Sequence, residues 1–297
     1  MACREYYQWL AGAAAGARNR PADLDLNWLR PIMSAETRPA DGTVRVQSVD
    51  AGGVPSEWVW ARNAHPDRRL LYLHGGGYVS GNAGNYREFT SVLSNMTGCA
   101  VLAANYRVGP EDPFPAAVQD AKSAFLWMHG QGVDGARTAT RTFIAGDSAG
   151  GGLTLSAMLA LRDAGAPLPD AAVTISAWTD LANTGDSVRT RADADVIMRA
   201  SWLPAFSKSY LADADPRHPL ASPLYADLSG LPPVLMQVGD AEVLLDDSVR
   251  VAEIIRAAGG QVILEVWPEM PHVWHIRGFP ESQQAVARIA EFISSFR

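Results

Sequence analysis

The sequence predicts an α/β fold in which a mostly parallel sheet has helices on both faces. From Thr43 onward, strand-like apolar segments alternate with helix-like segments, and this alternation is typical of such sheets. Several of the strand candidates are unbroken apolar runs, as expected for strands that are buried on both faces. The 297 residues, 47% of them hydrophobic, are enough to bury a large core as one domain.

The individual elements follow from apolar periodicity and from turn residues. An early hairpin is expected around Gly52 and Gly53, and a later strand runs directly into a loop of three glycines. The predicted strands cover residues 44–49, 57–60, 69–73, 100–105, 142–145, 172–177, 234–238 and 262–266. Helices are predicted over 114–128, from Ser148 to a stop at Gly165, from about Asp246, and at the end of the chain, where Val286, Ile289, Ala290 and Ile293 recur at helical spacing.

Two stretches fall outside this alternation. The expected organisation is an N-terminal segment over residues 1–40 and a catalytic domain over 41–297, with a helical insertion at about 183–219. A helical insertion between late strands would lie over the active site. Its apolar side chains either form a small core of their own or line a substrate pocket; the pocket candidates are Met198, Trp202, Leu203 and Phe206.

Charge and cysteine content exclude several classes of protein. The net charge of −7 argues against nucleic acid as a partner, because phosphate binding needs a basic face. The only cysteines are Cys3 and Cys99, so a disulfide scaffold is not expected and a reducing, cytoplasmic compartment fits. No uncharged apolar run approaches the roughly 18 residues of a membrane span. A signal peptide is the alternative for the Ala-rich start, but Glu5 and Gln8 interrupt its apolar stretch.

The strongest local motif is Gly146-Asp147-Ser148-Ala149-Gly150. This G-x-S-x-G sequence lies between a predicted strand and a predicted helix, and a sharp turn at that place exposes the serine hydroxyl above the sheet. Glycines permit the tight turn, and the helix N-terminus behind the serine favours a developing negative charge. Ser148 is therefore the candidate nucleophile.

A second motif, His74-Gly75-Gly76-Gly77-Tyr78, follows an earlier strand. Backbone N–H groups of glycines can approach a substrate closely, so this loop and Ala149 could supply the donors of an oxyanion hole. The alternative is a phosphate-binding loop, but the G-K-[ST] ending is missing and no basic residue follows before Arg87.

A serine nucleophile needs a general base, and His272 lies in a loop between the last predicted strand and the last helix. His275 is the alternative base. The two histidines could also belong to a zinc site, but no third ligand is evident. The orienting acid is Asp240 or Glu242, which follow the preceding strand, whereas Asp246 and Asp247 are typical acidic residues of a first helical turn.

These motifs together resemble the bacterial esterases of the hormone-sensitive-lipase family of α/β-hydrolases. The resemblance extends from about Arg69 to the C-terminus and rests on His74-Gly75-Gly76-Gly77, on Tyr106-Arg107 with Pro110-Glu111-Asp112-Pro113-Phe114-Pro115-Ala116-Ala117, and on Gly146-Asp147-Ser148-Ala149-Gly150-Gly151. The family pattern at the acid aligns with Glu242-Val243-Leu244-Leu245-Asp246, with glutamate in place of aspartate, and so favours Glu242 over Asp240.

The resemblance also implies functions for individual residues. It implies oxyanion donors at Gly76, Gly77 and Ala149, a structural His74, and a cap built from the N-terminal segment and the insertion. Tyr78 joins the expected substrate-binding residues. The resemblance allows a homodimer through the last strand and the last helix, and it favours short acyl chains.

The sequence thus predicts a serine carboxylesterase that acts on short-to-medium acyl esters and needs no metal or organic cofactor. A lactone or an amide would use the same residues. A non-catalytic small-molecule-binding protein is the alternative from another class, but such relatives have lost the histidine position that His272 fills here. Epoxide hydrolases and dehalogenases of similar fold use an aspartate where this chain has Ser148.

Overall fold

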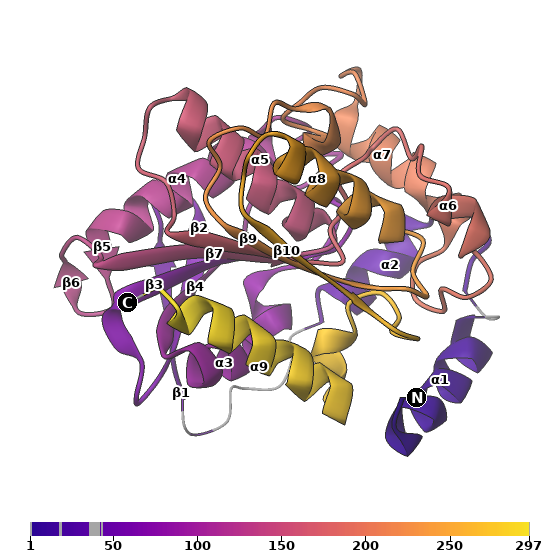
Figure 1. Ribbon diagram of the computed structural model, residues 1–297, viewed down its shortest axis with the longest axis horizontal. Coiled ribbons are helices and arrows are strands. Elements are labelled where there is room, and N and C mark those ends of the chain that lie inside the picture. Colours follow the sequence, from indigo (N-terminus) through magenta and orange to yellow (C-terminus); the bar gives the residue numbers. More distant parts are fainter. Residues whose placement is uncertain (1, 18–19, 36–41, 43, 297) are drawn as a thin grey trace.

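The computed structural model describes residues 2–17, 20–35, 42 and 44–296. Parts of the expected N-terminal segment, including residues 18–19 and 36–40, lie outside the described residues, as does residue 41, where the catalytic domain was expected to begin. The centre of the structure is an eight-stranded sheet with the strand order β1-β2-β4-β3-β7-β8-β9-β10 (Figure 1).

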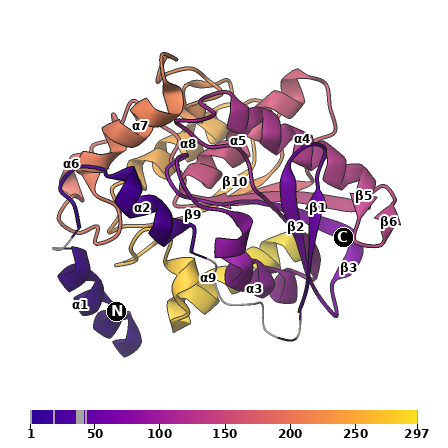
Figure 2. The ribbon, with the colours of Figure 1, turned by 180° about the vertical axis from the view of Figure 1, so that it is seen from behind.

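One side of this sheet is antiparallel. Strands β1 (Val44–Asp50) and β2 (Pro55–Ala61) form the predicted hairpin, with Asp50 opposite Pro55 (Figure 2). Strand β2 then pairs antiparallel with β4 (Cys99–Ala104). The turn between β1 and β2 uses Gly52 and Gly53, whose φ angles of 70° and 91° suit residues without a Cβ atom.

The rest of the sheet is parallel. From β4 onward in the sheet order, each strand runs parallel to its neighbour, so the carboxyl ends of these strands meet along one edge. The remaining strands of this parallel part are β3 (His65–Leu73), β7 (Arg141–Asp147), β8 (Ala171–Ile175), β9 (Val234–Gly239) and β10 (Val262–Trp267). The predicted fold class is confirmed, and β3 begins four residues earlier than the predicted strand 69–73.

Helices cover both faces of the sheet (Figure 1). Helices α3 (Arg87–Thr97) and α9 (Pro280–Ser294) lie on one face, and α4 (Ala116–Gly130), α5 (Ala149–Asp163) and α8 (Leu245–Ala257) lie on the other. Successive side chains of a strand point to opposite faces of the sheet, so each face can pack against its own layer of helices.

Strand β3 shows this alternation. Leu70 and Tyr72 are fully buried in the apolar cluster that includes residues of α3 and α9. Leu71 and Leu73 are equally buried, but they belong to the cluster that includes residues of α4, α5 and α8. A strand that is buried on both faces needs such an unbroken apolar run.

The sequence predicts no element for the stretch that forms α3. This helix is rich in serine, threonine and asparagine, residues with only moderate helix propensity. It is nevertheless buried along one side, and the hydroxyl groups of Thr90 and Thr97 donate to carbonyl oxygens one turn earlier in the helix. Tertiary packing therefore stabilises a helix that its composition does not predict.

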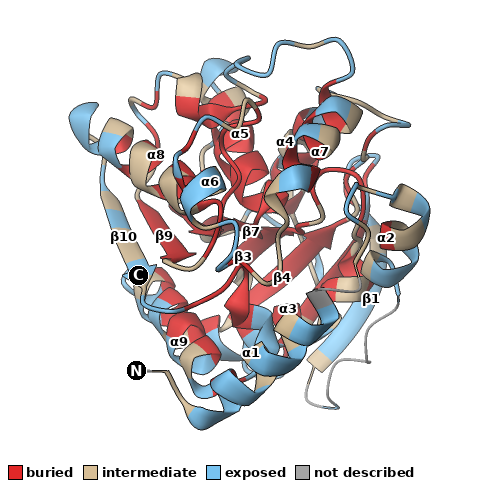
Figure 3. Ribbon diagram, turned by 90° about the vertical axis from the view of Figure 1, so that its right-hand side faces the viewer, coloured by how far each residue is buried: buried red, intermediate tan, exposed pale blue. Residues whose placement is uncertain are grey.

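The carboxyl edge of the sheet is covered by short helices. Figure 3 shows α1 (Arg4–Ala17), α2 (Leu26–Met33), α6 (Ser187–Thr190) and α7 (Leu203–Leu211) around the ends of the central strands. The small elements that complete the described structure are β5 (Gln131–Gly132), β6 (Gly135–Ala136), η1 (Ala83–Tyr86), η2 (Ala200–Trp202), η3 (Pro223–Tyr225) and η4 (Trp274–Arg277). In the described parts of the chain, no helix has both the length and the hydropathy needed to cross a bilayer.

Candidate active site

Ser148 occupies the turn between β7 and α5. Its φ and ψ angles are 53° and −121°, an unusual conformation for a residue with a side chain, and its N–H donates to the Ile175 carbonyl at 2.8 Å. The end of β3 packs directly against this turn and leaves no space for a side chain at Gly150. A Cβ atom there would lie 2.0 Å from the Leu73 carbonyl oxygen. The glycines of the motif are thus required by the close approach of β3, and they hold Ser148 at the carboxyl edge.

His272 lies within hydrogen-bond distance of this serine. Its Nε2 atom is 2.9 Å from Ser148 Oγ, and its Nδ1 atom is 2.8 Å from Glu242 Oε2. The histidine follows β10 and is buried, with only 4% of its surface exposed. Val273 continues the loop in a left-handed conformation, with φ of 52°, and its N–H donates to Ser176 Oγ at 3.1 Å. The loop is therefore held at the position where the imidazole meets Ser148.

Glu242 is fully buried and has partners for both carboxylate oxygens. While Oε2 faces His272, Oε1 accepts hydrogen bonds from Ser176 Oγ at 2.8 Å and from the Gly239 N–H at 2.6 Å. Because a carboxylate accepts Nδ1–H, this contact leaves the Nε2 lone pair of His272 free to receive the serine proton.

The alternative acid and the alternative base lie elsewhere. Asp240 Oδ1 accepts from the Glu269 N–H at 2.6 Å, and His275 Nε2 is paired with Gln237 Oε1 at 2.8 Å. Neither contributes to the hydrogen-bonded chain from Glu242 to Ser148. Among the described residues, no group of three or more His, Cys, Asp or Glu side chains is placed to hold a metal ion.

The surroundings of His272 determine its protonation. Burial lowers the pKa of His272, but the hydrogen bond and the negative charge of Glu242 outweigh burial and raise the pKa above its usual value. The charges of Asp195 and Asp147 act in the same direction. The site therefore stabilises a positively charged imidazolium, which is the form that exists after a proton has been taken from Ser148.

The loop after β3 presents unused backbone donors beside Ser148. Gly76 and Gly77 have φ angles of 120° and 64°, and no acceptor in the described structure pairs with their N–H groups. Ala149 is the first residue of α5, where N–H groups have no partner within the helix. The Phe206 ring packs against Gly77 so closely that a Cβ atom there would lie 2.6 Å from the ring. Three backbone donors are thus available near the serine.

His74 is a buried structural residue of this loop, as the family resemblance implies. Its Nδ1–H donates to the Gly75 carbonyl at 2.7 Å, and its ring stacks on Tyr106 with the ring centroids 4.3 Å apart. Burial lowers the pKa of His74 to about 4, so the imidazole is neutral at pH 7.

Asp147 has a role that the sequence does not predict. Its carboxylate accepts from the hydroxyls of Tyr72 and Tyr86, at 2.6 and 2.8 Å, and from the Gly75 N–H at 3.0 Å. Burial raises the pKa of Asp147, whereas these three donors lower it. The carboxylate therefore connects the serine turn to the glycine loop. Its place inside the G-x-S-x-G motif is the only sequence signal for this role.

Asp195 is a second residue whose role the sequence does not predict. One oxygen accepts from the N–H groups of Ile197 and Met198, at 2.9 and 2.8 Å, and the other accepts from the Val243 N–H at 3.0 Å. Because Val243 follows Glu242, Asp195 joins the insertion to the loop that carries the acid. Its position in the middle of the insertion gives no local signal for this role.

The comparisons with known proteins agree with this geometry. Residues 70–276 match the model of a family described as the alpha/beta hydrolase fold. The chain belongs to this family. This α/β-hydrolase is 47% identical to an acetyl-hydrolase of Streptomyces hygroscopicus over 284 residues, which cover 91% of this chain and 93% of the relative. It is 32% identical to an esterase of Acinetobacter venetianus over 286 residues, which cover 93% and 91% of the two chains.

Solved structures support the same assignment. An esterase described as a member of the bacterial hormone-sensitive lipase family has a TM-score of 0.91 and 40% identity, and the match covers 99% of this chain and 98% of that one. EstE5, in a crystal soaked with p-nitrophenyl butyrate, has a TM-score of 0.91 and 38% identity, with 98% of each chain covered. The predicted family is confirmed, and this α/β-hydrolase is a carboxylic ester hydrolase.

A cavity of about 880 Å³ adjoins the serine in this hydrolase. Ser148 and His272 lie at its base, and residues of α1, α2, α3, the insertion and η4 form its walls. Of the predicted substrate-binding residues, Met198, Trp202 and Phe206 line the cavity.

Tyr78 and Leu203 are not part of this cavity lining. The Tyr78 ring is buried against Tyr210, with the ring centroids 4.0 Å apart, and Leu203 belongs to the main apolar cluster. The sequence assigns both to the substrate pocket because they adjoin residues that do line it. The local backbone directs their side chains into the core instead.

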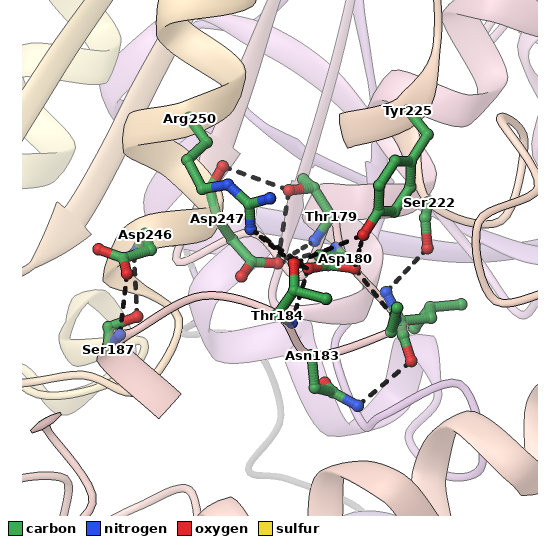
Figure 4. A network of polar contacts seen from close by, with 12 residues as sticks. Thr179, Asp180, Asn183, Thr184, Ser187, Ser222, Tyr225, Asp246, Asp247 and Arg250 are labelled. Atoms are coloured by element: carbon green, nitrogen blue, oxygen red, sulfur yellow. Dashed lines mark hydrogen bonds and ion pairs between the residues drawn. The ribbon is translucent and has the colours of Figure 1, made fainter. Parts of the chain in front are cut away.

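Buried carboxylates also fix the segment after β8 to the start of α8 (Figure 4). Asp247 Oδ2 accepts from the N–H groups of Thr179 and Asp180, at 2.7 and 2.8 Å. Burial raises the pKa of Asp247 to about 7, against the effect of these donors. Asp180 in turn pairs with Arg250 at 3.3 Å. Because α8 begins three residues after Glu242, this network supports the position of the acid.

Proposed function

We propose that this hydrolase is a serine carboxylesterase that cleaves short-to-medium acyl esters through an acyl-enzyme intermediate. Ser148 is the nucleophile, His272 the general base and Glu242 the orienting acid. The observation that supports this most directly is the unbroken chain of hydrogen bonds from Glu242 to His272 to Ser148, with contacts of 2.8 and 2.9 Å. Such a chain activates a hydroxyl that is a weak nucleophile by itself.

In the first half of the reaction, Ser148 Oγ attacks the ester carbonyl while His272 Nε2 takes its proton. The carbonyl oxygen becomes an oxyanion, which accepts hydrogen bonds from the N–H groups of Gly76, Gly77 and Ala149. Glu242 stabilises the imidazolium. His272 then donates its proton to the leaving alcohol oxygen, and the acyl group remains on Ser148.

In the second half, a water molecule takes the place of the alcohol. His272 removes a proton from this water as it attacks the acyl-enzyme carbonyl, and the same backbone donors hold the second oxyanion. The imidazolium then returns its proton to Ser148 Oγ, which releases the carboxylic acid. The cycle needs only groups of this chain and water.

The acyl range follows from the walls of the cavity and from the relatives. The Phe206 ring lies against Gly77, beside the proposed oxyanion position, and the Trp202 ring, which also lines the cavity, lies 6.3 Å from it between centroids. The Streptomyces relative is named an acetyl-hydrolase, and the EstE5 crystal was soaked with a butyryl ester. These observations favour acetyl to butyryl groups over long acyl chains.

We further propose that α1, α2 and the insertion at about 183–219 form a cap over this cavity, which they line together with η4. We also propose a homodimer through β10 and α9. Strand β10 is the last strand of the sheet, and among the described residues it pairs only with β9. It exposes Ile263 and Val266, at 45% and 43% of their surfaces, and an edge strand with such residues favours pairing with another chain.

Hydrolysis of p-nitrophenyl esters from acetate to palmitate by the wild type and by Ser148→Ala tests the proposal. We expect the wild type to cleave the esters from acetate through butyrate faster than the longer esters. The variant should lose at least about 10³-fold in kcat, since the triad acts as a unit. Equal activity of both proteins would contradict Ser148 as the nucleophile. If the folded wild type is inert toward all esters but cleaves lactones or amides, the ester assignment is wrong; if it only binds such molecules, a binding function replaces it.

A further inference from the structure

Two arginines line the catalytic cavity. Arg277 is the last residue of η4, five positions after His272, and its side chain is exposed. Arg20 precedes α2 and is partly buried. The two residues come from opposite ends of the chain, so only the tertiary structure brings them to one cavity.

Neither guanidinium has an ion-pair partner in the described structure. Arg20 Nη1 donates to the Ile197 carbonyl at 2.6 Å, and the Arg277 guanidinium lies over the Trp9 ring, 5.4 Å from its centroid. Other arginines of the chain do have carboxylate partners, for example Arg30, Arg87, Arg107, Arg162, Arg250 and Arg288. The cavity arginines thus differ from these six arginines.

Each of the two guanidinium groups is also repelled by another arginine. Partial loss of hydration lowers the pKa of Arg277, Tyr86 opposes this effect, and the charge of Arg20 adds to it. Burial and the charge of Arg199 lower the pKa of Arg20, whereas the charge of Asp195 raises it. Asp195 already accepts three backbone hydrogen bonds and does not neutralise the pair. An anion between two unpaired cations would relieve this repulsion.

The position of Arg277 and Arg20 in the cavity places them near the alcohol portion of the ester. His272 must reach the leaving oxygen in order to protonate it, so the alcohol portion of the ester lies on the His272 side of the serine. Arg277 belongs to the segment that continues from His272, together with Ile276 and Gly278, which also line the cavity. The arginines therefore face the alcohol portion.

We propose that Arg277 and Arg20 bind a carboxylate on the alcohol portion of the ester, so that the preferred substrates are acyl esters of hydroxy acids. The proposal rests on the esterase function proposed above. A planar guanidinium pairs with a carboxylate through two parallel hydrogen bonds. Glu88 lines the same cavity, and its negative charge favours a singly charged carboxylate over a phosphate.

The experiment compares two acetyl esters that differ in one charge: 4-acetoxybenzoate and its methyl ester. The readout is the ratio of their kcat/KM values, measured for the wild type, Arg277→Gln, Arg277→Lys and Arg20→Gln. Arg189→Gln is the matched control, because Arg189 is 79% exposed and lies outside the cavity lining. The ratio should fall roughly tenfold in both glutamine variants and stay unchanged in the control, since a hydrogen bond to a charged group is worth about a factor of ten or more.

Ionic strength provides a second readout that needs no variant. In the wild type the ratio should fall between about 0.01 and 1 M salt, because the Debye length shortens from about 30 to 3 Å. Arg277→Gln should lose most of this dependence, and Arg277→Lys should keep it.

A ratio that is the same in the wild type and in both glutamine variants, or that is insensitive to salt in the wild type, would overturn the proposal. If the wild type hydrolyses neither ester, the esterase function itself is wrong. If the wild type hydrolyses both esters and the variants do not change the ratio, only the carboxylate site is wrong.

Discussion

At the scale of single residues, the site depends on how each buried polar group is paired. Glu242 directs one oxygen at His272 and uses the other to accept from Ser176 and Gly239. Asp147 performs a similar function for the glycine loop. A buried carboxylate with several donors has little freedom to rotate, so the imidazole that it contacts is held in one orientation and one tautomer.

The pH dependence of activity tests the role of Glu242. His272 must be neutral to take the proton from Ser148, so activity falls on the acid side as the imidazole becomes protonated. Because the pKa of His272 is raised, mainly by Glu242, this loss should occur above the usual range of a free imidazole. In Glu242→Gln the acid limb of kcat/KM should move to lower pH, and kcat should fall by roughly 10⁴-fold, as when an orienting carboxylate is removed from a serine triad.

The control for this variant is Asp240→Asn, which changes the other candidate acid. Asp240 contacts the Glu269 N–H and lies outside the hydrogen-bonded chain. We expect its pH–rate profile to match that of the wild type. The opposite pattern, with a shifted profile in Asp240→Asn and a normal one in Glu242→Gln, would reverse the assignment of the acid.

At the scale of elements, the side chain of Arg30 attaches α2 to the glycine loop that follows β3. Arg30 donates to the carbonyls of Val79 and Gly109, at 2.8 and 2.7 Å, and forms a bidentate pair with Glu111. The hydrogen bonds from Arg30 lower the pKa of Glu111 to about 2. Because Leu29 and Met33 of the same helix line the cavity, Arg30 connects the cavity wall with the loop that carries the proposed oxyanion donors.

Arg30→Ala should therefore loosen α2 without changing the chemistry at Ser148. We expect KM for p-nitrophenyl butyrate to rise roughly tenfold, since one hydrogen bond to a charged group contributes about 1.5–3 kcal/mol. The value of kcat should change much less. Arg45→Ala, on the exposed strand β1, is the matched control. A loss confined to kcat would mean that Arg30 acts on the reacting groups rather than on the cavity wall.

At the scale of the whole molecule, the parallel part of the sheet ends at strand β10. In the part of the chain that the structure describes, β9 is the one strand that pairs with β10. Ile263 and Val266 contribute exposed apolar surface at this edge, whereas proteins that avoid edge pairing usually place charged residues there.

Replacement of both residues by lysine tests the proposed dimer. Sedimentation or light scattering should show a dimer for the wild type and a monomer for Ile263→Lys/Val266→Lys, because two like charges at a shared edge repel each other. Met96→Lys introduces a lysine at another exposed apolar position, on α3, and should leave the dimer intact. A wild type that is monomeric at micromolar concentration would contradict the proposal.

The sequence by itself determined the chain order of the strands of the main sheet and of helices α4, α5, α8 and α9, the G-x-S-x-G turn and the glycine loop. These features depend on local periodicity, on glycine at positions that exclude a Cβ atom, and on chain order, all of which are visible in neighbouring residues. The same reasoning placed Ser148 and His272 after the correct strands and left Asp240 as an alternative to Glu242.

Only the tertiary structure decided which distant groups meet. It brought Glu242 rather than Asp240 to His272, joined Asp195 to the Glu242 loop, directed Tyr78 into the core, and placed Arg20 and Arg277 in the lining of one cavity. The tertiary structure also decides helix α3, because burial rather than helix propensity stabilises it. The physical reason is common to all of them: contacts between residues far apart in the chain depend on packing and on the direction of each side chain, which local patterns do not specify.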